Sequence, residues 1–371
     1  MLGFNPTSFV RPVASIFILY LKLLLLIRVH NTESFGRFSF PKLVWDQTNE
    51  GPLDKVPKSV DEITVIGASG NVGKLVALRL SDEFKVNGVV RDSMSATRVL
   101  PFFNDLINQK KVNLLECNLV EEAMRSQANG IANAAQYPVQ IQAALKSANT
   151  LIICTGTTAF PTQAWSKSSS GMSSFAPDVL KALVRNKFSV AKTMLDLDKQ
   201  GLNTPENIDN ICNRFIVNAW DNLCQVQQKR IVMISSIGVN RRKSMPFAFL
   251  NLCGVLEAKA RGEEAVKSAA RKGGYSYTIV RPGQLFGGPY DNNYYLGTLF
   301  KLDKDVDEQK LQLRLGDELL GDTLRSSLAE VTAQICELDA AKNVEFSVIN
   351  VKGDLQDISS IQASLKDLRV L

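Results

Sequence analysis

The sequence predicts an α/β fold with a doubly wound parallel sheet that carries helices on both faces. The first indication is that short, almost continuously apolar runs alternate with helical stretches along most of the 371 residues. Strands that are apolar throughout are typical of sheets buried on both sides. The second indication is three glycines, spaced G-x-x-G-x-x-G, that join the first apolar run directly to a helix. This order of strand, glycine turn and helix is typical of a Rossmann-type sheet.

Six strands are expected in this sheet, and a helix should follow the glycines at residues 74–80. The strands are expected at residues 63–66, 86–90, 111–117, 150–154, 230–236 and 277–281. A segment with a Ser-rich patch, residues 166–201, breaks the alternation after the fourth strand. We expect an insertion here, on the side of the sheet where the strands end, that is either a lid or a tolerated loop.

The glycine motif predicts a dinucleotide site. Its residues are Gly67, Ala68, Ser69, Gly70, Asn71, Val72 and Gly73. Gly67 allows a sharp turn, Gly70 lets the backbone approach a phosphate, and Gly73 lets the helix pack closely on the strand. The amide groups at the start of the helix would then face the pyrophosphate. A purely structural turn is the alternative, because tight turns use glycine in any case.

The end of the second strand favours NADP(H) over NAD as the cofactor. An acidic residue at this place would bond the ribose 2′-hydroxyl of NAD. Arg91 is found there instead, and its guanidinium suits the 2′-phosphate of NADP. Asp92 follows at once and could turn inward to take the NAD role. A solvated pair of charges at a strand end is the remaining alternative.

The chain divides into three parts. Residues 1–60 are a presequence and linker, residues 61–350 are the nucleotide-binding domain, and residues 351–371 are a C-terminal tail. Within the domain, residues 284–350 are expected to form a small C-terminal substrate region. The aromatic and amide side chains of this region suit a moderately large, partly polar ligand or a protein surface.

Composition excludes several classes of function. The net charge of +6 is modest and partly confined to the first 40 residues, so no nucleic-acid partner is expected. The single histidine, His30, precedes the domain, which therefore lacks a Ser-His-Asp triad, a His-ligated metal and a histidine general acid. The six cysteines form no C-x-x-C pair. They are expected to be buried thiols in a reduced compartment, and no metal site is expected.

The N-terminus predicts a targeting segment. Residues 13–27 are apolar apart from Ser15 and Lys22, which makes them short for a spanning helix of about 20 residues and favours a signal peptide. Residues 31–40, which follow, are rich in serine and phenylalanine. Together the two stretches resemble the bipartite presequence of algae with secondary plastids, an ER signal followed by a transit peptide, and predict a plastid location. A signal anchor that keeps the protein on a membrane is the alternative.

Five segments in the same order resemble the atypical short-chain dehydrogenase/reductase family. They are residues 67–73, 89–92, 154–161, 234–239 and 277–283. The resemblance covers about residues 63–350. It is strongest to the NmrA-like branch that includes the NADP-binding subunit of the plastid inner-envelope translocon and photosystem-assembly factors. The resemblance implies a Rossmann fold that binds NAD(P).

The resemblance also implies positions around the adenosine half of the cofactor. Asn118 would lie beside the adenine, where the family usually has an aspartate, so this contact would be weaker. Thr155 and Gly156 would pass under the adenosine ribose.

Around the nicotinamide, the resemblance implies roles for five residues. Lys259 would bond the nicotinamide ribose and assist catalysis, and Ser235 and Ser236 would lie near the nicotinamide. Arg281 and Pro282 would wall the nicotinamide pocket. The alternatives are that the serines only end a strand, and that Lys259 is a solvated helix lysine paired with Glu263 at i,i+4.

The sequence departs from the family at the general acid. The family's usual Y-x-x-x-K places a tyrosine four residues before the lysine, but Val255 stands there and valine transfers no proton. Either another group supplies the proton or hydride transfer no longer occurs. The candidate donors are Ser235, Ser236, Tyr290, Tyr294, Tyr295 and water.

Two functions follow. The first is an NADPH-dependent reductase of a plastid metabolite. The second is a non-catalytic NADP(H)-binding protein that senses redox state or serves as a scaffold in a plastid protein complex, such as one that assembles photosystems. Membrane contact is expected only through the N-terminal presequence.

Overall fold

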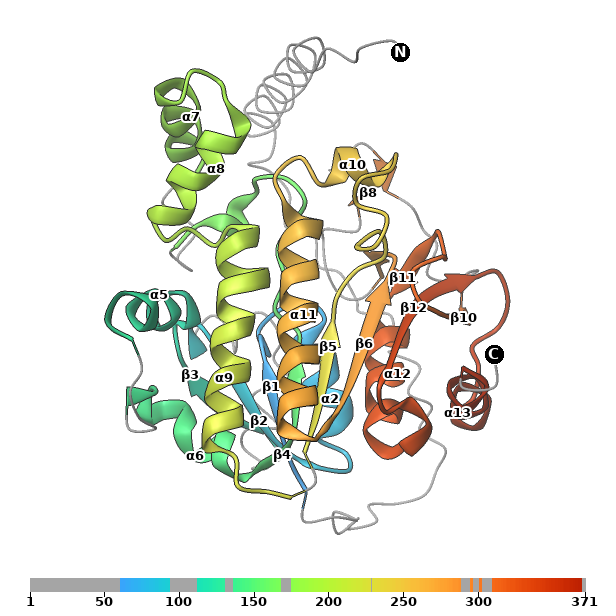
Figure 1. The fold of residues 1–371 in the computed structure, drawn as a ribbon. Helices are drawn as coiled ribbons and strands as arrows, with labels where there is room; N and C mark the ends of the chain where they lie inside the picture. The colour runs from blue at the N-terminus through green and yellow to red at the C-terminus, as the bar shows by residue number, and fades with distance from the viewer. Residues whose placement is uncertain are drawn as a thin grey trace, which may run out of the picture.

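A computed structural model shows the arrangement of the chain (Figure 1). It describes residues 61–93, 112–130, 136–167, 175–227, 229–287, 294–295, 300–301 and 309–368. The presequence predicted at residues 1–60 and the serine patch at 168–171 lie outside these residues.

One large sheet organises the molecule, with strand order β3-β2-β1-β4-β5-β6-β12-β11-β7 and β10 paired to β12. The strands of its parallel part are β1 (Glu62–Ile66), β2 (Lys85–Val90), β3 (Val112–Glu116), β4 (Ala148–Ile153), β5 (Arg230–Ile234), β6 (Ser276–Pro282) and β12 (Val344–Val351). The order 3-2-1-4-5-6 is that of a doubly wound Rossmann sheet, so the predicted fold class is confirmed.

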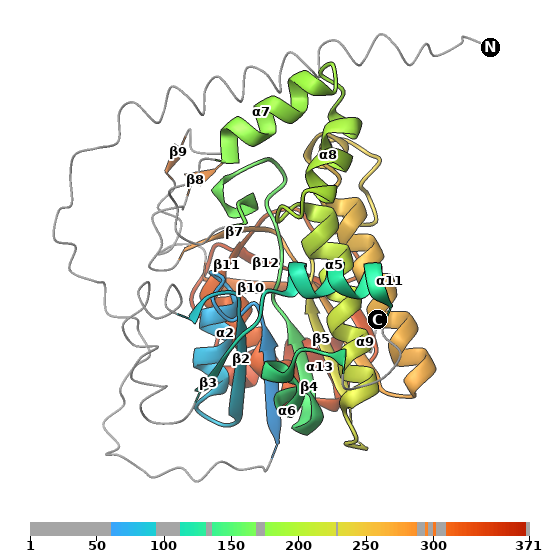
Figure 2. The ribbon, with the colours of Figure 1, turned by 90° about the vertical axis from the view of Figure 1, so that its left-hand side faces the viewer.

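Helices cover both faces of the sheet, as Figures 1 and 2 show. One face carries α2 (Gly73–Leu80) and α12 (Arg325–Glu337), and the other carries α9 (Asn213–Leu223) and α11 (Val255–Gly273). The helices α5 (Leu119–Asn129) and α6 (Val139–Ser147) pack in the same apolar cluster as α9 and α11. The active edge in such a sheet is the one where the parallel strands end.

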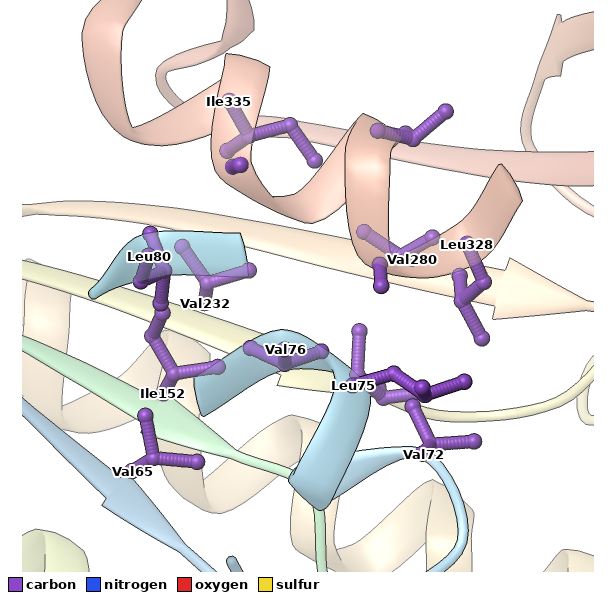
Figure 3. Packing of buried hydrophobic residues seen from close by; sticks show 14 of the residues in the cluster. Val65, Val72, Leu75, Val76, Leu80, Ile152, Val232, Val280, Leu328 and Ile335 are labelled. Atoms are coloured by element: carbon purple, nitrogen blue, oxygen red, sulfur yellow. The ribbon is translucent and has the colours of Figure 1, made fainter. Parts of the chain in front are cut away.

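Successive side chains of each central strand lie on opposite faces of the sheet and belong to different apolar clusters. Val65, Ile152, Val232 and Val280 pack with α2 and α12 (Figure 3). Their neighbours Ile66, Leu151, Ile153, Met233 and Ile279 join the cluster under α9 and α11. This alternation explains why the strands are apolar throughout, because both faces are buried.

The segment after β4 contains a helical hairpin of α7 (Phe175–Arg185) and α8 (Val190–Lys199). It follows a short turn, η2 (Gln163–Trp165), and projects beyond the strand ends (Figure 1). The hairpin packs through its own apolar cluster, made of Trp165, Val179, Ala182, Leu183, Leu197, Leu202 and Cys253. The structure thus places helices within the stretch where the sequence predicted an insertion.

The C-terminal part is built into the main body. β12 pairs parallel to β6, and β10 (Lys310–Leu315) and β11 (Asp322–Leu324) pair antiparallel to β12. β7 (Gln284–Phe286) pairs with β11, and a separate ribbon joins β8 (Tyr294–Tyr295) to β9 (Phe300–Lys301). Beyond them, α13 (Ile358–Asp367) buries Ile361 and Leu365 in the same cluster as α2.

Short helical segments complete the chain. They are η3 (Glu206–Cys212), a π-helix that runs into α9, α10 (Phe247–Leu250) and η4 (Asp339–Ala341). Over the described residues, no helix is both long enough and apolar enough to cross a membrane.

All six cysteines are free thiols. Cys117, Cys212, Cys224 and Cys253 are buried, and Cys154 and Cys336 are half-buried. Burial raises the pKa of Cys117, Cys154, Cys253 and Cys336 to about 12. A thiol with so high a pKa stays protonated and is a poor nucleophile, which agrees with the expectation of small buried residues.

Candidate functional site

The turn after β1 needs glycine at two positions. Gly67 has φ +78°, in the left-handed region, and its amide and that of Ala68 both donate to the Val89 carbonyl on β2. A Cβ at Gly73 would lie 2.1 Å from the Gly67 carbonyl oxygen. Any side chain at Gly73 would therefore push α2 away from the strand, which is the close packing that the motif predicts.

The start of α2 is open to an anion. A Cβ at Gly70 would meet only the Gly67 oxygen, at 3.2 Å, within 4 Å. The first turn of α2 has no acidic residue, and its N-cap Val72 makes no side-chain capping bond. With Ser69 and Asn71 half-buried in the same turn, the segment forms a backbone cradle that fits the pyrophosphate of a dinucleotide.

Arg91 lies where β2 ends and reaches toward the loop after β4. Its Nη1 donates to the Ser166 carbonyl at 3.2 Å. Burial lowers the pKa of Arg91, and the neighbouring Asp92 carboxylate opposes this effect. Asn118, the N-cap of α5, is half-buried and makes no side-chain capping bond. Both residues are at the edge where the parallel strands end.

The most unusual part of the site is a buried ion pair. The Lys259 Nζ on α11 lies 2.6 Å from Asp209 Oδ1 on η3, and the Asp209 side chain is fully buried. The other carboxylate oxygen accepts hydrogen bonds from the amide and hydroxyl of Thr157, at 3.2 and 2.5 Å. A Cβ added to Gly156, which is exposed, would lie 3.1 Å from Nζ. The ammonium group thus lies just beneath the loop after β4.

A π-helix brings Asp209 to this place. A Cβ at Gly262 would lie 2.3 Å from the Asp209 carbonyl oxygen, so the glycine lets η3 touch α11 nearly one turn after Lys259. Asn213 donates from Nδ2 to the same oxygen at 3.0 Å and accepts from the Thr155 hydroxyl at 2.7 Å. Wider π turns often occur at functional sites. Asp209, Asn213 and the loop after β4 therefore form one connected unit.

The alternative that Lys259 is a solvated lysine paired with Glu263 is wrong. Lys259 is 7% exposed and pairs with Asp209. Glu263 is instead bonded to Arg281, with contacts of 3.0 and 2.6 Å, and it accepts the Ser235 hydroxyl at 2.5 Å. The reason is that Glu263 lies over β6, whose Arg281 guanidinium needs a counter-charge in the core.

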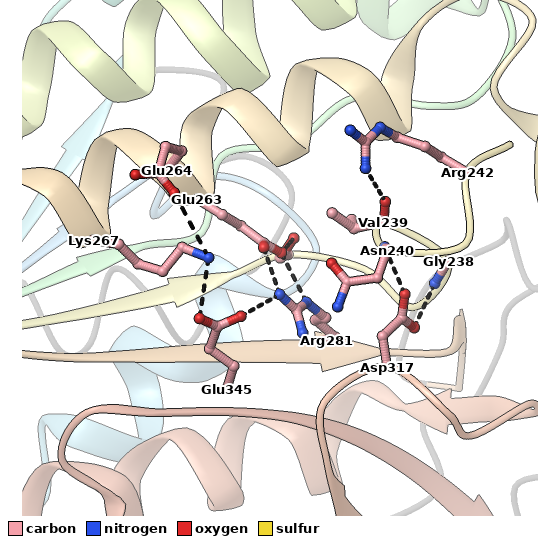
Figure 4. A network of polar contacts seen from close by, with 11 residues as sticks. Gly238, Val239, Asn240, Arg242, Glu263, Glu264, Lys267, Arg281, Asp317 and Glu345 are labelled. Atoms are coloured by element: carbon pink, nitrogen blue, oxygen red, sulfur yellow. Dashed lines mark hydrogen bonds and ion pairs between the residues drawn. The ribbon is translucent and has the colours of Figure 1, made fainter.

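Arg281 thus belongs to a second polar network, between α11 and the sheet (Figure 4). Ser235 joins this network through its hydrogen bond to Glu263. The Arg281 Nη2 also contacts Glu345 at 2.5 Å, and Glu345 pairs with Lys267 at 3.0 Å. This network holds α11 against β6 and β12. The Ser235 hydroxyl proton is directed to Glu263.

The remaining predicted residues near the nicotinamide lie at the ends of β5 and β6. The Ser236 hydroxyl donates to the Ile237 carbonyl at 3.0 Å. The Pro282 carbonyl accepts the Ile237 amide at 2.9 Å. These bonds tie the two strand ends together.

Val255 lies in an apolar cluster and offers no proton. It is buried with Ile237, Val239, Phe247 and Leu256. The described tyrosine side chains are elsewhere, since Tyr275 and Tyr277 stand at the start of β6 and Tyr137 packs on Phe215. Tyr290 and the side chains of Tyr294 and Tyr295 lie outside the described residues. The Lys259 ammonium group lies beneath the loop after β4, 3.1 Å from where a Cβ of Gly156 would be.

Sequence reasoning missed Asp209, Thr157 and Asn213 as parts of the site. One signal was present: Asp209 and Asn213 are spaced i,i+4, as are the apolar residues Ile208, Cys212 and Ile216 of the same run. Polar residues on the inner face of an otherwise apolar helix need partners. The sequence did not identify the partners, which come from segments 50 or more residues away.

Asp198 is expected to make the stability of the protein depend on pH. Burial raises the pKa of Asp198, at the end of α8, to about 6, although the Thr204 hydroxyl donates to it at 2.5 Å. When a carboxyl group has a raised pKa in the folded state, the free energy of unfolding of the protein falls as pH rises from about 4 to above 6. We expect Asp198→Asn to raise the free energy of unfolding by about 1 kcal/mol above pH 6 and by much less at pH 4. Urea unfolding across this range measures the difference, and a gain that did not change with pH would contradict the assignment.

The model of a family described as NAD(P)H-binding matches residues 67–312. No curated protein matches the chain. Similar solved structures include a putative NAD-dependent epimerase/dehydratase from Bacillus halodurans, with 16% identity, 82% of this chain and 99% of that chain covered, and a TM-score of 0.48. An oxidoreductase from Lactococcus lactis has 14% identity, 84% and 97% coverage and a TM-score of 0.48. An anaerobilin reductase from Escherichia coli has 16% identity, 80% and 99% coverage and a TM-score of 0.44.

Proposed function

Because the chain belongs to the NAD(P)H-binding family, we propose that it is an NADPH-dependent reductase of a plastid metabolite. The observation that carries the proposal is the buried Lys259–Asp209 pair beneath the exposed Gly156. Burying an ion pair costs free energy of desolvation, even when further hydrogen bonds hold it. Its position at the edge where the parallel strands end therefore favours a chemical role over a stabilising one.

Lys259, Asp209 and Thr157 have separate roles in the proposed reduction. NADPH, held by the Gly67–Gly73 turn and Arg91, would supply a hydride to an electrophilic carbon of the substrate. Lys259 Nζ then donates a proton to the oxygen or carbon that becomes negative, and water returns the proton. Asp209 orients Nζ, and Thr157 fixes Asp209. Lys259 thereby supplies the proton that Val255 cannot provide, and Asp209 holds the lysine in place.

Arg91 supports NADPH as the cofactor. A guanidinium at the end of β2 bonds a 2′-phosphate by charge-assisted contacts, which contribute about 1.5–3 kcal/mol. We expect Arg91→Ala to weaken NADPH binding by roughly 10–100-fold and to leave NADH binding nearly unchanged. Fluorescence titration with both nucleotides measures the two affinities. Arg125→Ala, which removes an exposed arginine on α5, is the control, and equal loss of both nucleotides would contradict the role of Arg91.

The second candidate is a non-catalytic NADP(H)-binding sensor or scaffold in a plastid complex. The observation that favours it is the apolar surroundings of Val255, which leave no hydroxyl where the family's tyrosine would stand. In this case Lys259 and Asp209 would couple nucleotide binding to the position of the loop after β4. A protein partner would then be released or bound as the nucleotide changes.

One experiment separates the two candidates. The protein is incubated with 4-deuterated NADPH and a plastid metabolite extract, and deuterium is followed by mass spectrometry. A labelled product establishes a reductase and identifies its substrate. Absence of label, with NADPH binding confirmed in the same sample, favours the sensor. Gly70→Asp, whose carboxylate would project over the start of α2, is the control and should not bind NADPH.

The proposed plastid location rests on residues 1–60, through the apolar stretch and the Ser- and Phe-rich stretch that follows it. A fluorescent protein fused to these residues should accumulate in the plastid of an alga with a secondary plastid. Fluorescence confined to the ER or the plasma membrane would contradict the plastid location and favour a signal anchor.

A further inference from the structure

The α7–α8 hairpin exposes an unusual amount of apolar surface. Nine large apolar side chains are exposed among the described residues, and four of them belong to this hairpin, between residues 180 and 195. They are Leu180 at 44%, Val184 at 56%, Phe188 at 45% and Leu195 at 58% exposure. Scattered exposed apolar residues need no explanation, but a concentration on one projecting element indicates a contact surface.

The α7 helix has three distinct sides. Val179, Ala182 and Leu183 are buried against Trp165 and the other members of the hairpin cluster. Leu180 and Val184, spaced i,i+4, share an exposed apolar side. Lys181 and Arg185, also spaced i,i+4, lie next to them and are exposed.

The turn between the helices extends the apolar side. Lys187 and Phe188 have φ of 52° and 61°, the left-handed region that bulky residues rarely adopt. The Phe188 amide donates to the Leu183 carbonyl at 2.8 Å, so the turn is held by backbone bonds while both side chains are exposed. The unfavourable left-handed backbone conformation thus occurs at Lys187 and Phe188, whose basic and aromatic side chains face solvent.

The exposed charges of the hairpin are mostly positive. Apart from Arg185, which is paired with Asp196, the exposed basic residues are Lys181, Lys187, Lys192 and Lys199, and the exposed acidic residue is Asp178. Asp196 is bonded to Arg185 at 3.0 Å, and Asp198 is held by Thr204. A surface on which exposed apolar side chains are interleaved with lysines favours an anionic partner.

We propose that the α7–α8 hairpin docks on the surface of an anionic lipid bilayer. Lysine is depleted at protein–protein interfaces, but it is enriched beside the apolar side of helices that lie in a membrane interface. There the ammonium groups reach the headgroups while Leu180, Val184 and Phe188 enter the acyl boundary. This proposed contact does not depend on the proposed reaction.

The test places a local probe on the hairpin of the full chain. Phe188→Trp is mixed with phosphatidylcholine vesicles that contain about 30% phosphatidylglycerol and brominated acyl chains, which quench an indole only on contact. Leu355→Trp is the matched control, because Leu355 is also exposed but precedes α13, far from the hairpin (Figure 1). The unsubstituted chain gives the background of its three tryptophans.

We expect quenching at position 188 and none above background at position 355. Adding Lys181→Glu and Lys187→Glu should lower partitioning at least roughly tenfold, as should replacing phosphatidylglycerol by neutral lipid. Lys366→Glu, an exposed lysine on α13, should leave partitioning unchanged. The proposal is overturned if position 188 is not quenched, if position 355 is quenched equally, or if neutral vesicles bind as well. Shielding of position 188 by an acidic soluble protein in place of vesicles would also overturn it.

Discussion

Lys259→Ala is expected to lower the rate of hydride transfer by about 10²–10⁴-fold. The Nζ of Lys259 is held beneath Gly156 by Asp209, at 2.6 Å, and the alanine variant removes this ammonium group. The loss should appear in kcat. NADPH affinity should fall by no more than about tenfold, which corresponds to one lost hydrogen bond to the ribose.

Two variants refine this prediction. Asp209→Asn keeps the size of the side chain but removes the carboxylate that orients Nζ, so kcat should fall while substrate KM changes little. Lys272→Ala removes an exposed lysine from the other end of α11 and should have no effect. Rates within about threefold of wild type for Lys259→Ala would remove this lysine from the chemistry.

Glu263→Ala is expected to lower the free energy of unfolding by about 3–5 kcal/mol. The Arg281 side chain is 1% exposed and lies between Glu263 and Glu345. Removing Glu263 leaves a buried guanidinium with one carboxylate fewer and also leaves the Ser235 hydroxyl without its acceptor. Chemical denaturation of the variant and of wild type measures the difference.

The next residue on the helix provides the control. Glu264 is 60% exposed and pairs with Arg271, so Glu264→Ala should cost less than about 1 kcal/mol. Adding Arg281→Met to Glu263→Ala should restore part of the lost stability, because the uncompensated charge is then gone as well. Equal effects of Glu263→Ala and Glu264→Ala would show that the network does not hold α11 on the sheet.

The second network also changes how the family resemblance applies to this chain. Arg281 was expected to wall the nicotinamide pocket, and Ser235 to lie near it. Their polar groups are bonded to Glu263, between α11 and β6. Both residues are adjacent to the edge where the strands end, but in this structure their side-chain bonds serve to connect helix and sheet.

Local signals in the sequence were sufficient for the first half of the fold. Strand β1, the glycine turn and α2 lie within 19 residues, and the constraint on Gly73 comes from Gly67, six residues earlier. Turns and helix starts depend on neighbouring residues, so the sequence shows them directly. Apolar runs likewise predicted β4, β5 and β6, because strands buried on both faces have little freedom in composition.

The pairing of β12 with β6 was not predicted. Residues 284–350 were expected to form a small C-terminal substrate region, and nothing in the residues of β12 shows that its neighbour is β6, more than 60 residues earlier. Long-range strand pairing depends on which surfaces the intervening chain leaves open. Here α12 packs on α2 and returns the chain to the edge of the parallel strands.

The sequence by itself determined that this chain forms a doubly wound sheet with a tight glycine turn at Gly67–Gly73, because each of these features is encoded within a short run of residues. Only the tertiary structure decided the partner of Lys259. Asp209 lies 50 residues away, and the pair forms because Gly262 lets η3 touch α11 and Thr157 fixes the carboxylate. Contacts of this kind depend on the close packing of distant segments, which no local pattern records.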